Sequence, residues 1–269
     1  MDNGNILAGL DSGHVNTKAI LMRGKEILGY TTIPTGFDIV SSAQTALNYA
    51  LENAEVTHGE LAKVAATGIF RDIVEVPPLN VNRTVPDYTA DAKGALFLNQ
   101  NSRTVIDIGG NIHKAVHYDQ HGNLLDVIQN DKCADGLGIF YTTMAKALGV
   151  SEQELSELAL RSTKHVSVAI HCAASAESEA IDLICQGVDI EDVADAISRF
   201  IAERVAAMCT YLPMAKEIVA VGSLAKSKAL INHLSILLNQ DVSSLDLPEY
   251  AGAIGAAVTN NEGLLVENE

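Results

Sequence analysis

A short pattern that occurs twice constrains the fold of this chain more than any other feature of its sequence. Asp11 and Asp107 each end a short apolar run, each has a glycine two residues later, and each is followed after seven residues by a lysine, Lys18 or Lys114. Short apolar runs bounded by turn residues are typical of buried strands. Chance explains either copy alone, but two copies with one spacing favour an internal duplication.

Strand-like stretches follow both copies, with Gly24 and Gly122 at the expected hairpin turns. We therefore expect two related halves that each open with a β-meander, in an α/β fold with mixed sheets. The predicted domains are residues 1–98 and 99–269. The first half contains one predicted helix, Ile39–Asn53, and Pro77, Pro78 and Pro86 mark an irregular stretch after it. The second half contains the remaining predicted helices, which are Gly138–Leu148, Glu152–Leu160, Cys172–Cys185, Ile190–Tyr211, Lys226–Leu238 and Ala251–Thr259.

The acidic composition of the chain argues against some classes of binding partner. The chain has 269 residues, 48% of them hydrophobic, and a formal net charge of −16. Nucleic acid and anionic membranes should repel so acidic a protein, so neither is an expected partner. The N-terminus does not resemble a signal peptide, and no apolar run reaches the roughly 18 residues of a membrane span. A cytoplasmic protein is expected.

The two Asp-Gly turns would make a phosphate site if they faced each other across a cleft. Glycine lets backbone amides approach phosphate oxygens, and lysines add positive charge. Asp11 and Asp107 would hold hydrated Mg²⁺ and orient the attacking water, since phosphoryl transfer depends mainly on positioning and charge neutralisation. The other expected phosphate-binding residues are Gly13, Asn16 and Lys18 in the first turn and Gly109, Gly110 and Lys114 in the second.

A third glycine turn is expected to bind the nucleoside. Gly222 and Ser223 follow a predicted strand and precede a predicted helix, which suits contact with an adenosine or its α-phosphate. Such junctions are also ordinary connectors. No Walker A sequence and no G-x-G-x-x-G opening a helix occurs, which disfavours the P-loop and Rossmann folds.

The chain has four cysteines, and two of them are candidate metal ligands. Cys133 and Cys172 each stand near the start of a predicted helix, where the helix dipole favours a thiolate. Two thiolates are half of a four-thiolate site, and a two-fold dimer would supply the other half. Two unrelated thiols are the alternative that the spacing leaves open. Cys185 and Cys209 fall in apolar helical segments and are expected to be small core residues.

Several stretches resemble a known ATPase family, which contains the activators of 2-hydroxyacyl-CoA dehydratases and the ATP-binding subunits of benzoyl-CoA reductases. The resemblance covers essentially the whole chain. Its main stretches are Asn130-Asp131-Lys132-Cys133-Ala134 with Gly136 and Gly138, Ser162-Thr163-Lys164 through Cys172 to Glu179, Thr67-Gly68-x-x-Arg71, Val105–Gly110, and Tyr250–Ala257.

The resemblance implies an actin-like fold and a dimer that shares one [4Fe–4S] cluster, with Cys133 and Cys172 as the ligands from each chain. It also implies that binding and hydrolysis of ATP to ADP changes the conformation of the protein. The cluster then passes one low-potential electron to a partner iron–sulfur dehydratase or reductase. Ferredoxin or flavodoxin is the expected electron donor, and Gly136 and Gly138 match a nucleotide-binding loop of the family.

Five positions depart from the family pattern. His14 replaces a small hydroxyl residue, Asn111-Ile112 replaces Gln-Asp, Leu137 replaces Thr, and Ser223 replaces Gly. His14 could donate to a phosphate and Asn111 could orient the attacking water, or both could simply fill their turns.

Three other functions are compatible with the sequence. The chain could be a subunit of a benzoyl-CoA reductase-type complex, in a heterodimer with a related ATPase subunit. A small-molecule kinase of the same fold, such as a sugar kinase, would need no iron. A nucleotide-binding regulator would bind ATP without turnover.

Overall fold

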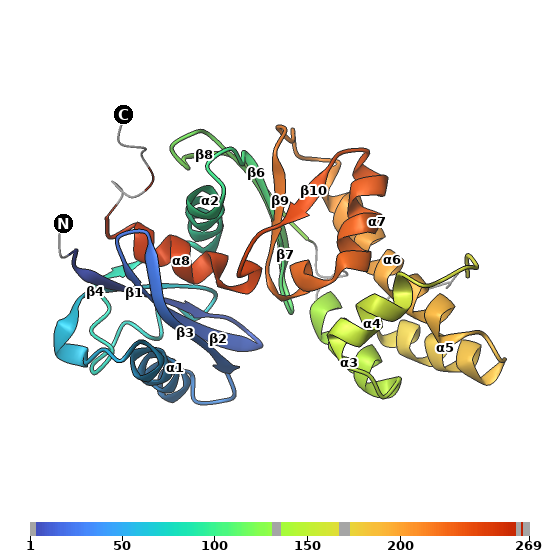
Figure 1. Cartoon of the computed structure of the whole chain (residues 1–269), viewed down its shortest axis with the longest axis horizontal. Coiled ribbons are helices and arrows are strands. Elements are labelled where there is room, and N and C mark those ends of the chain that lie inside the picture. Colours follow the sequence, from blue (N-terminus) through green and yellow to red (C-terminus); the bar gives the residue numbers. More distant parts are fainter. Residues whose placement is uncertain (1–3, 131–135, 167–172, 262–264, 266–269) are drawn as a thin grey trace. The chain divides into compact units, whose positions relative to one another are not determined.

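The structure is a computed structural model that describes residues 4–130, 136–166, 173–261 and 265 (Figure 1). The chain divides into two compact units. Unit 1 comprises Met1–Arg103, Tyr118–Leu125 and Glu249–Glu269, and unit 2 comprises Thr104–His117 and Asp126–Pro248. The predicted domains 1–98 and 99–269 were defined by the sequence repeat and not by packing, and that division stays a prediction.

Unit 1 is built on a mixed five-stranded sheet. Its strands are β1 (Ile6–Ser12), β2 (Asn16–Arg23), β3 (Glu26–Pro34), β4 (Leu61–Thr67) and β5 (Arg83–Thr84). Their order is β3-β2-β1-β4-β5. The first three strands form the expected antiparallel meander, and β4 runs parallel to β1. The C-terminal ends of β1 and β4 therefore meet at one edge of the sheet.

Helices cover both faces of this sheet (Figure 1). Successive residues of a strand face opposite sides. Ala8 and Leu10 of β1 belong to the same core cluster as Ala46 and Leu47 of α1 (Ile39–Ala54). Gly9, between them, faces α8 (Ala251–Val258) instead, because a Cβ on Gly9 would lie 1.9 Å from the carbonyl oxygen of Ala253.

Helix α8 also packs closely against α2 (Asp87–Leu98). A Cβ on Gly94 would lie 1.9 Å from the Ala251 carbonyl oxygen, and one on Gly255 would lie 1.8 Å from that of Ala90. Only glycine permits backbones to approach so closely. Helix α2 is absent from the predicted helices, because Asp91 and Lys93 are buried and interrupt its apolar pattern.

Unit 2 contains most of the second sheet. The strands of this sheet are β6 (Thr104–Ile108), β7 (His113–Tyr118), β8 (Leu124–Gln129), β9 (Ile218–Val221) and β10 (Val242–Ser244). The last residue of β7 and the first two residues of β8 belong to unit 1. Their order is β10-β9-β6-β7-β8, with β7 antiparallel and β9 parallel to β6. Read from β8 to β10, this order is that of the first sheet from β3 to β5. The two sheets thus share a topology, as the sequence repeat predicts.

The helices of unit 2 follow the predicted ones closely. They are α3 (Leu137–Ala147), α4 (Glu152–Ala159), α5 (Ala173–Cys185), α6 (Ile190–Cys209) and α7 (Lys228–Leu238). One predicted helix begins differently. The short 3-10 helix η3 (Ser223–Lys226) precedes α7, and the Ser227 hydroxyl caps α7 by accepting a hydrogen bond from the Leu230 amide. A search of the described residues for a helix that could cross a membrane found none.

Candidate functional site

The first Asp-Gly turn joins β1 to β2. Asp11 and Lys18 face each other across the two strands, and their carboxylate and ammonium groups lie 2.7 Å apart. The Gly13 amide closes the turn by donating to the Asn16 carbonyl oxygen over 3.1 Å. A Cβ on Gly13 would lie 2.9 Å from that oxygen, so a glycine is required. The spacing D-x-G-x4-K is therefore the spacing of a cross-strand ion pair around a tight turn.

The second turn, between β6 and β7, repeats this geometry. Asp107 and Lys114 are register partners, and their charged groups lie 2.9 Å apart. A Cβ on Gly109 would lie 2.8 Å from the Ile112 carbonyl oxygen, which repeats the close contact at Gly13. The duplication thus extends to the placement of each carboxylate, lysine and turn glycine.

A further glycine stands behind each carboxylate. Gly68 follows β4 with φ +88°, and Gly222 follows β9 with φ +87°. A Cβ would lie 2.6 Å from Asp11 Oδ1 at the first position and 2.4 Å from Asp107 Oδ1 at the second. Gly222 was predicted as a site residue and Gly68 was not. The sequence did contain a signal for Gly68, because each of the two glycines directly follows a predicted strand. In the structure these strands, β4 and β9, pair in parallel with the strands that carry Asp11 and Asp107.

Other groups shape the first turn in unit 1. The Thr35 hydroxyl donates to the Gly13 carbonyl oxygen over 2.8 Å. The exposed His14 lies edge-on to Phe70, with ring centroids 5.4 Å apart. Among the described residues, the buried hydroxyls of Ser12 and Thr67 have no hydrogen-bond partner. The role of His14 as a phosphate donor stays a prediction.

The start of α3 supports the second turn in unit 2. The Gly136 amide donates to the Asn111 carbonyl oxygen over 2.9 Å, and the Ile139 amide donates to that of Gly110 over 3.0 Å. A Cβ on Gly138 would lie 2.5 Å from the Gly109 carbonyl oxygen. The predicted residues Asn111, Gly136 and Gly138 are thus brought together with the Asp107 turn.

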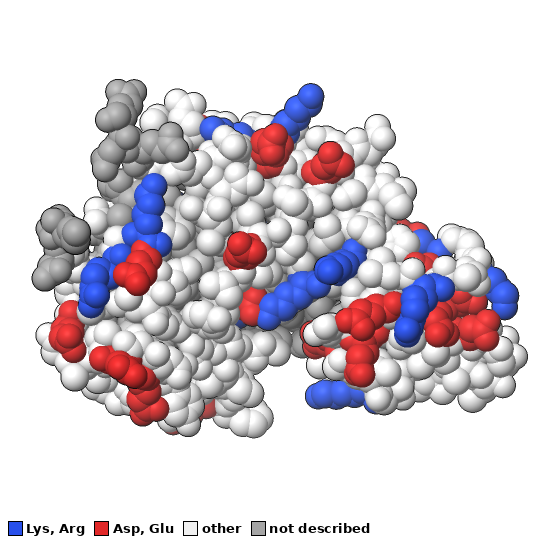
Figure 2. All heavy atoms as spheres, in the orientation of Figure 1, with Lys and Arg blue, Asp and Glu red and all other residues white. Residues whose placement is uncertain are grey.

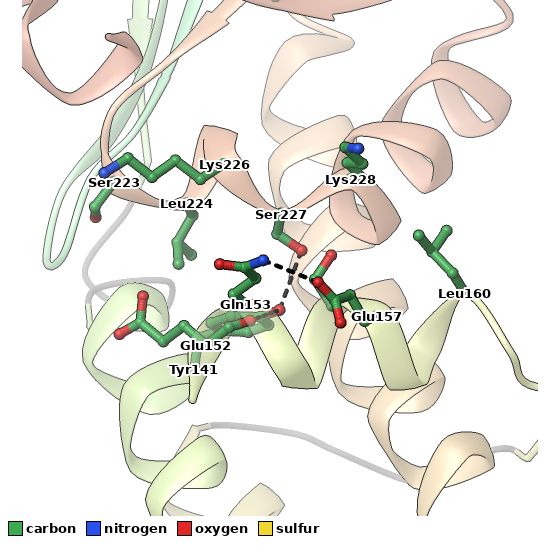
Figure 3. Close-up of a pocket in the computed structure, with 11 residues that line it drawn as sticks. Tyr141, Glu152, Gln153, Glu157, Leu160, Ser223, Leu224, Lys226, Ser227 and Lys228 are labelled. Carbon is green, nitrogen blue, oxygen red and sulfur yellow. Dashed lines mark hydrogen bonds between the residues drawn. The ribbon is translucent and has the colours of Figure 1, made fainter. Parts of the chain in front are cut away.

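A pocket of about 310 Å³ opens in unit 2 and is lined by Ser223, the residue after Gly222 (Figure 3). That volume is at the lower end of the roughly 300–1,000 Å³ of small-molecule sites. Its walls are α4, η3 and the first turn of α7, with Tyr141 of α3. The lining residues are Tyr141, Glu152, Gln153, Ser156, Glu157, Leu160, Ser223, Leu224, Lys226, Ser227 and Lys228.

Hydrogen bonds hold the polar walls of this pocket in place. The Tyr141 hydroxyl pairs with that of Ser227 over 3.1 Å, and Gln153 donates to Glu157 over 2.9 Å. Burial raises the pKa of Tyr141, so its hydroxyl stays neutral. Acidic side chains gather over the region of α4 and α5 on the face drawn in Figure 2. Across the pocket from α4, Lys226 and Lys228 supply the opposite charge.

A profile of the BadF/BadG/BcrA/BcrD ATPase family matches residues 8–259. The chain belongs to this family. The match includes both Asp-Gly turns, the Gly222 junction and all residues that line the pocket. The resemblance stated from the sequence is confirmed.

Curated relatives and solved structures that resemble this chain over almost its whole length come from dehydratase systems. The (R)-2-hydroxyglutaryl-CoA dehydratase activating ATPase of Acidaminococcus fermentans is 33% identical over 93% of this chain and 95% of its own. The solved component A of that organism's dehydratase superposes with a TM-score of 0.87, with 32% identity over 94% of this chain and 96% of that one. The solved activator of the 2-hydroxyisocaproyl-CoA dehydratase from Clostridium difficile, with bound ADPNP, gives a TM-score of 0.87, with 28% identity over 98% and 99% of the two chains.

A reductase polypeptide and a sugar kinase also resemble this chain. A benzoyl-CoA reductase polypeptide of Thauera aromatica is 28% identical over 80% of this chain and 77% of its own. A ROK family glucokinase from Streptomyces griseus shares only the fold, with a TM-score of 0.60 and 14% identity over 94% and 98% of the two chains. The predicted actin-like, sugar-kinase type fold is confirmed.

Two of the four cysteines, Cys185 and Cys209, lie within the described residues. Cys133 and Cys172 lie outside the described residues, so their predicted role as cluster ligands stays a prediction. Within the part of the chain that the structure describes, no three His, Cys, Asp or Glu side chains gather as a metal site. Cys209 is buried as predicted, and burial raises its pKa to about 12. Cys185 was predicted to be a core residue and is exposed, because it ends α5 at the surface.

Proposed function

We propose that this chain is an ATP-dependent activator of a 2-hydroxyacyl-CoA dehydratase. The observation that carries the proposal is the Gly222-Ser223 junction in unit 2. Gly222 packs against the Asp107 carboxylate, and Ser223 lines the pocket next to it. A nucleoside in the pocket would therefore reach the Asp107 turn with its phosphates. The family membership and the ADPNP-bound relative support the same ligand.

The turn residues suit phosphate and magnesium chemistry. Asp107 and Asp11 carry carboxylates of the kind that hold hydrated Mg²⁺, and each already has a lysine beside it. We propose that phosphate oxygens bind Lys114 in place of the Asp107 carboxylate when the nucleotide binds, which leaves that carboxylate to hold the metal and orient the attacking water. Asp11 and Lys18 stay predicted site residues of unit 1. Gly109 and Gly110 would present amides to the phosphates, and Asn111 would orient the water.

The donor set of the chain also suits a shared cluster. Cys172 immediately precedes α5, Cys133 stands four residues before α3, and these two helices pack together. Two thiolates from each of two chains complete a four-thiolate set. A bound [4Fe–4S] cluster would supply one low-potential electron to the partner dehydratase and regain it from a donor such as ferredoxin or flavodoxin. ATP hydrolysis would act on this transfer through contacts that differ between nucleotide states.

Nucleotide binding and turnover are tested with one variant and one control. We expect the wild type to bind Mg·ADPNP in calorimetry and to hydrolyse ATP. Asp107→Asn should keep its nucleotide affinity within about tenfold and lose at least about a hundredfold in hydrolysis rate, since removing one charged transition-state contact has that order of effect. Asp126→Asn, at an exposed position on β8, is the matched control. Equal hydrolysis by both variants would contradict the assignment of Asp107.

The cluster is tested by analysis of anaerobically purified protein. We expect about four irons and four sulfides per dimer, with a visible absorption that is lost in Cys133→Ala. Cys185→Ala removes an exposed thiol and should change neither iron content nor spectrum. Protein that binds ATP but holds no iron under these conditions would contradict the electron-transfer function and leave the ATPase assignment standing.

A second candidate is a permanent subunit of a benzoyl-CoA reductase-type complex, which the likeness to the Thauera aromatica reductase polypeptide favours. A related ATPase subunit would then replace the second copy of this chain. Purification from the native source separates the two candidates. A homodimer without other chains supports the activator, and a stable complex with a related ATPase chain supports the reductase subunit.

A further inference from the structure

The helix that begins at the pocket wall is hydrogen-bonded to α6 on its far side. Ser227 and Lys228, at the start of α7, line the pocket. One and a half turns further along α7, the His233 ring lies with its Nε2 atom 2.7 Å from Asp195 Oδ1 of α6. Both side chains are largely covered, at 21% and 16% exposure. A movement of α7 at the pocket would therefore displace His233 and change its hydrogen bond to Asp195.

Asp195 in turn contacts Arg199, one helical turn along α6. Arg199 Nη1 lies 3.5 Å from Asp195 Oδ2, and the arginine side chain is 13% exposed. The same guanidinium donates to the Val166 carbonyl oxygen and contacts His165 Nδ1. His233, Asp195 and Arg199 thus connect α7 to the backbone after α4. We call these three residues the α6 relay.

The backbone that the relay reaches, residues 162–166, is also anchored to α6 at a second point. Asp192 Oδ1 accepts hydrogen bonds from the Ser162 hydroxyl and from the Thr163 and Lys164 amides, over 2.8, 3.1 and 3.1 Å. The Lys164 amide and the Ser162 hydroxyl lower the pKa of the Asp192 carboxyl, so it is ionised at neutral pH. One face of α6 therefore holds this whole segment.

The 162–166 segment is connected to the pocket on its other side as well. It follows α4, whose residues Glu152, Gln153 and Glu157 form a pocket wall, and Leu160 lies between. Leu160 also lines a second groove, together with the segment, Asp195 and His233. The segment is thus linked to both walls of the pocket, to α4 by the chain and to α7 by the relay.

We propose that His233, Asp195 and Arg199 are positioning residues that couple nucleotide occupancy of the pocket to the conformation of the 162–166 segment. The inference rests on the proposed function, because it needs a nucleotide in the pocket. Ligand coupling of this kind requires contacts that differ between the bound and free states. A nucleotide that moves α7 relative to α6 would change the length of the His233–Asp195 hydrogen bond, and this bond would then be a contact that differs between the two states. In the sequence, the predicted cluster ligand Cys172 follows Val166 by 172 − 166 = 6 residues.

The test is amide hydrogen exchange of Thr163 and Lys164 in the full-length protein, with and without Mg·ADPNP. In the wild type we expect the nucleotide to change their exchange rates by roughly fivefold or more, the lower end of ordinary coupling. In His233→Ala the nucleotide should still bind, and the change should fall below about twofold. His233→Gln keeps a side-chain N–H for Asp195 and should restore the response. Asn232→Ala, at a neighbouring position of the same groove, is the matched control and should respond as the wild type does.

Two outcomes would overturn the relay and leave the proposed function intact. One is nucleotide binding to the wild type without any change of exchange in the segment. The other is an undiminished change in His233→Ala. A wild type that binds no nucleotide would overturn the proposed function together with the relay, and calorimetry on the same sample distinguishes that case.

Discussion

Gly222 occupies a position where an added methyl group meets two obstacles. Its φ of +87° strains any other residue, and a Cβ would lie 2.4 Å from Asp107 Oδ1 and 2.6 Å from the Ile108 carbonyl oxygen. The backbone must therefore shift before an alanine fits. The shift would move both the Asp107 carboxylate, which contacts Gly222, and Ser223, which follows it in the chain.

We predict that Gly222→Ala lowers the free energy of unfolding of unit 2 by more than the backbone strain of a positive φ accounts for. Gly187→Ala is the matched control, because Gly187 has φ +83° and nothing within 4 Å of its ideal Cβ. The control should cost about 1–2 kcal/mol in the free energy of unfolding, and Gly222→Ala should cost at least about 2 kcal/mol more. Urea unfolding gives both values. Equal losses would show that the backbone at Gly222 relaxes freely, against the close packing described above.

At this scale the sequence singled out the four charged residues of the two turns, but it did not predict that each aspartate pairs with its lysine. Asp11, Lys18, Asp107 and Lys114 could be assigned because their spacing repeats. Gly68 escaped because its partner, the Asp11 carboxylate, is 57 residues away in the chain, and only the pairing of β1 with β4 brings them together. A contact between strands of this separation leaves no local pattern in the sequence.

Among the elements, α8 and α2 are joined by backbone contact instead of interlocking side chains. Gly94 of α2 faces the Ala251 carbonyl oxygen, and Gly255 of α8 faces that of Ala90. Such reciprocal contacts fix the separation of the two helices within unit 1. Every residue of α8 is buried, and so is the central stretch of α2 from Ala90 to Leu96 that contacts it.

We predict that Gly94→Ala lowers the stability of unit 1, although alanine is the better helix former by about 1 kcal/mol. Its Cβ would lie 1.9 Å from a backbone oxygen, so the helices must separate, and we expect a loss of about 3 kcal/mol or more. Gly59→Ala is the control, because its Cβ meets only the Thr57 hydroxyl at 4.0 Å. Denaturant unfolding followed by hydrogen exchange assigns the loss to a unit. A gain in stability for Gly94→Ala would contradict the backbone contact.

The same two helices show what sequence periodicity predicts at the scale of elements. The apolar run of α8 was predicted nearly to its ends. Helix α2 was missed because Asp91 and Lys93 are buried within it, and a pattern of apolar and polar residues assumes that charged residues lie outside. The break between η3 and α7 was missed for another reason, since the serine cap at Ser227 lies inside an otherwise helical pattern.

At the scale of the whole molecule, two units share one sheet topology and one turn geometry but differ in what surrounds the turn. In unit 2 the Gly222 junction continues into η3 and the pocket. In unit 1 the equivalent Gly68 continues into a loop whose Phe70 packs on His14. Duplication thus accounts for the two carboxylate–lysine pairs, and the divergence after the fourth strand of each sheet assigns the nucleoside to unit 2 in the proposed function.

The net charge of −16 should make the stability of the protein depend on salt. The excess of acidic over basic residues repels itself in the compact state. Raising NaCl from about 10 mM to 150 mM shortens the Debye length from about 30 Å to about 8 Å. We expect the Tm of the nucleotide-free protein to rise by about 2–4 °C, which corresponds to roughly 1 kcal/mol for a chain of this size. Asp126→Lys at an exposed site brings the charge to −16 + 2 = −14 and should reduce the rise. A Tm that falls with salt would mean that local ion pairs such as Asp11–Lys18 and Asp107–Lys114 outweigh the general repulsion.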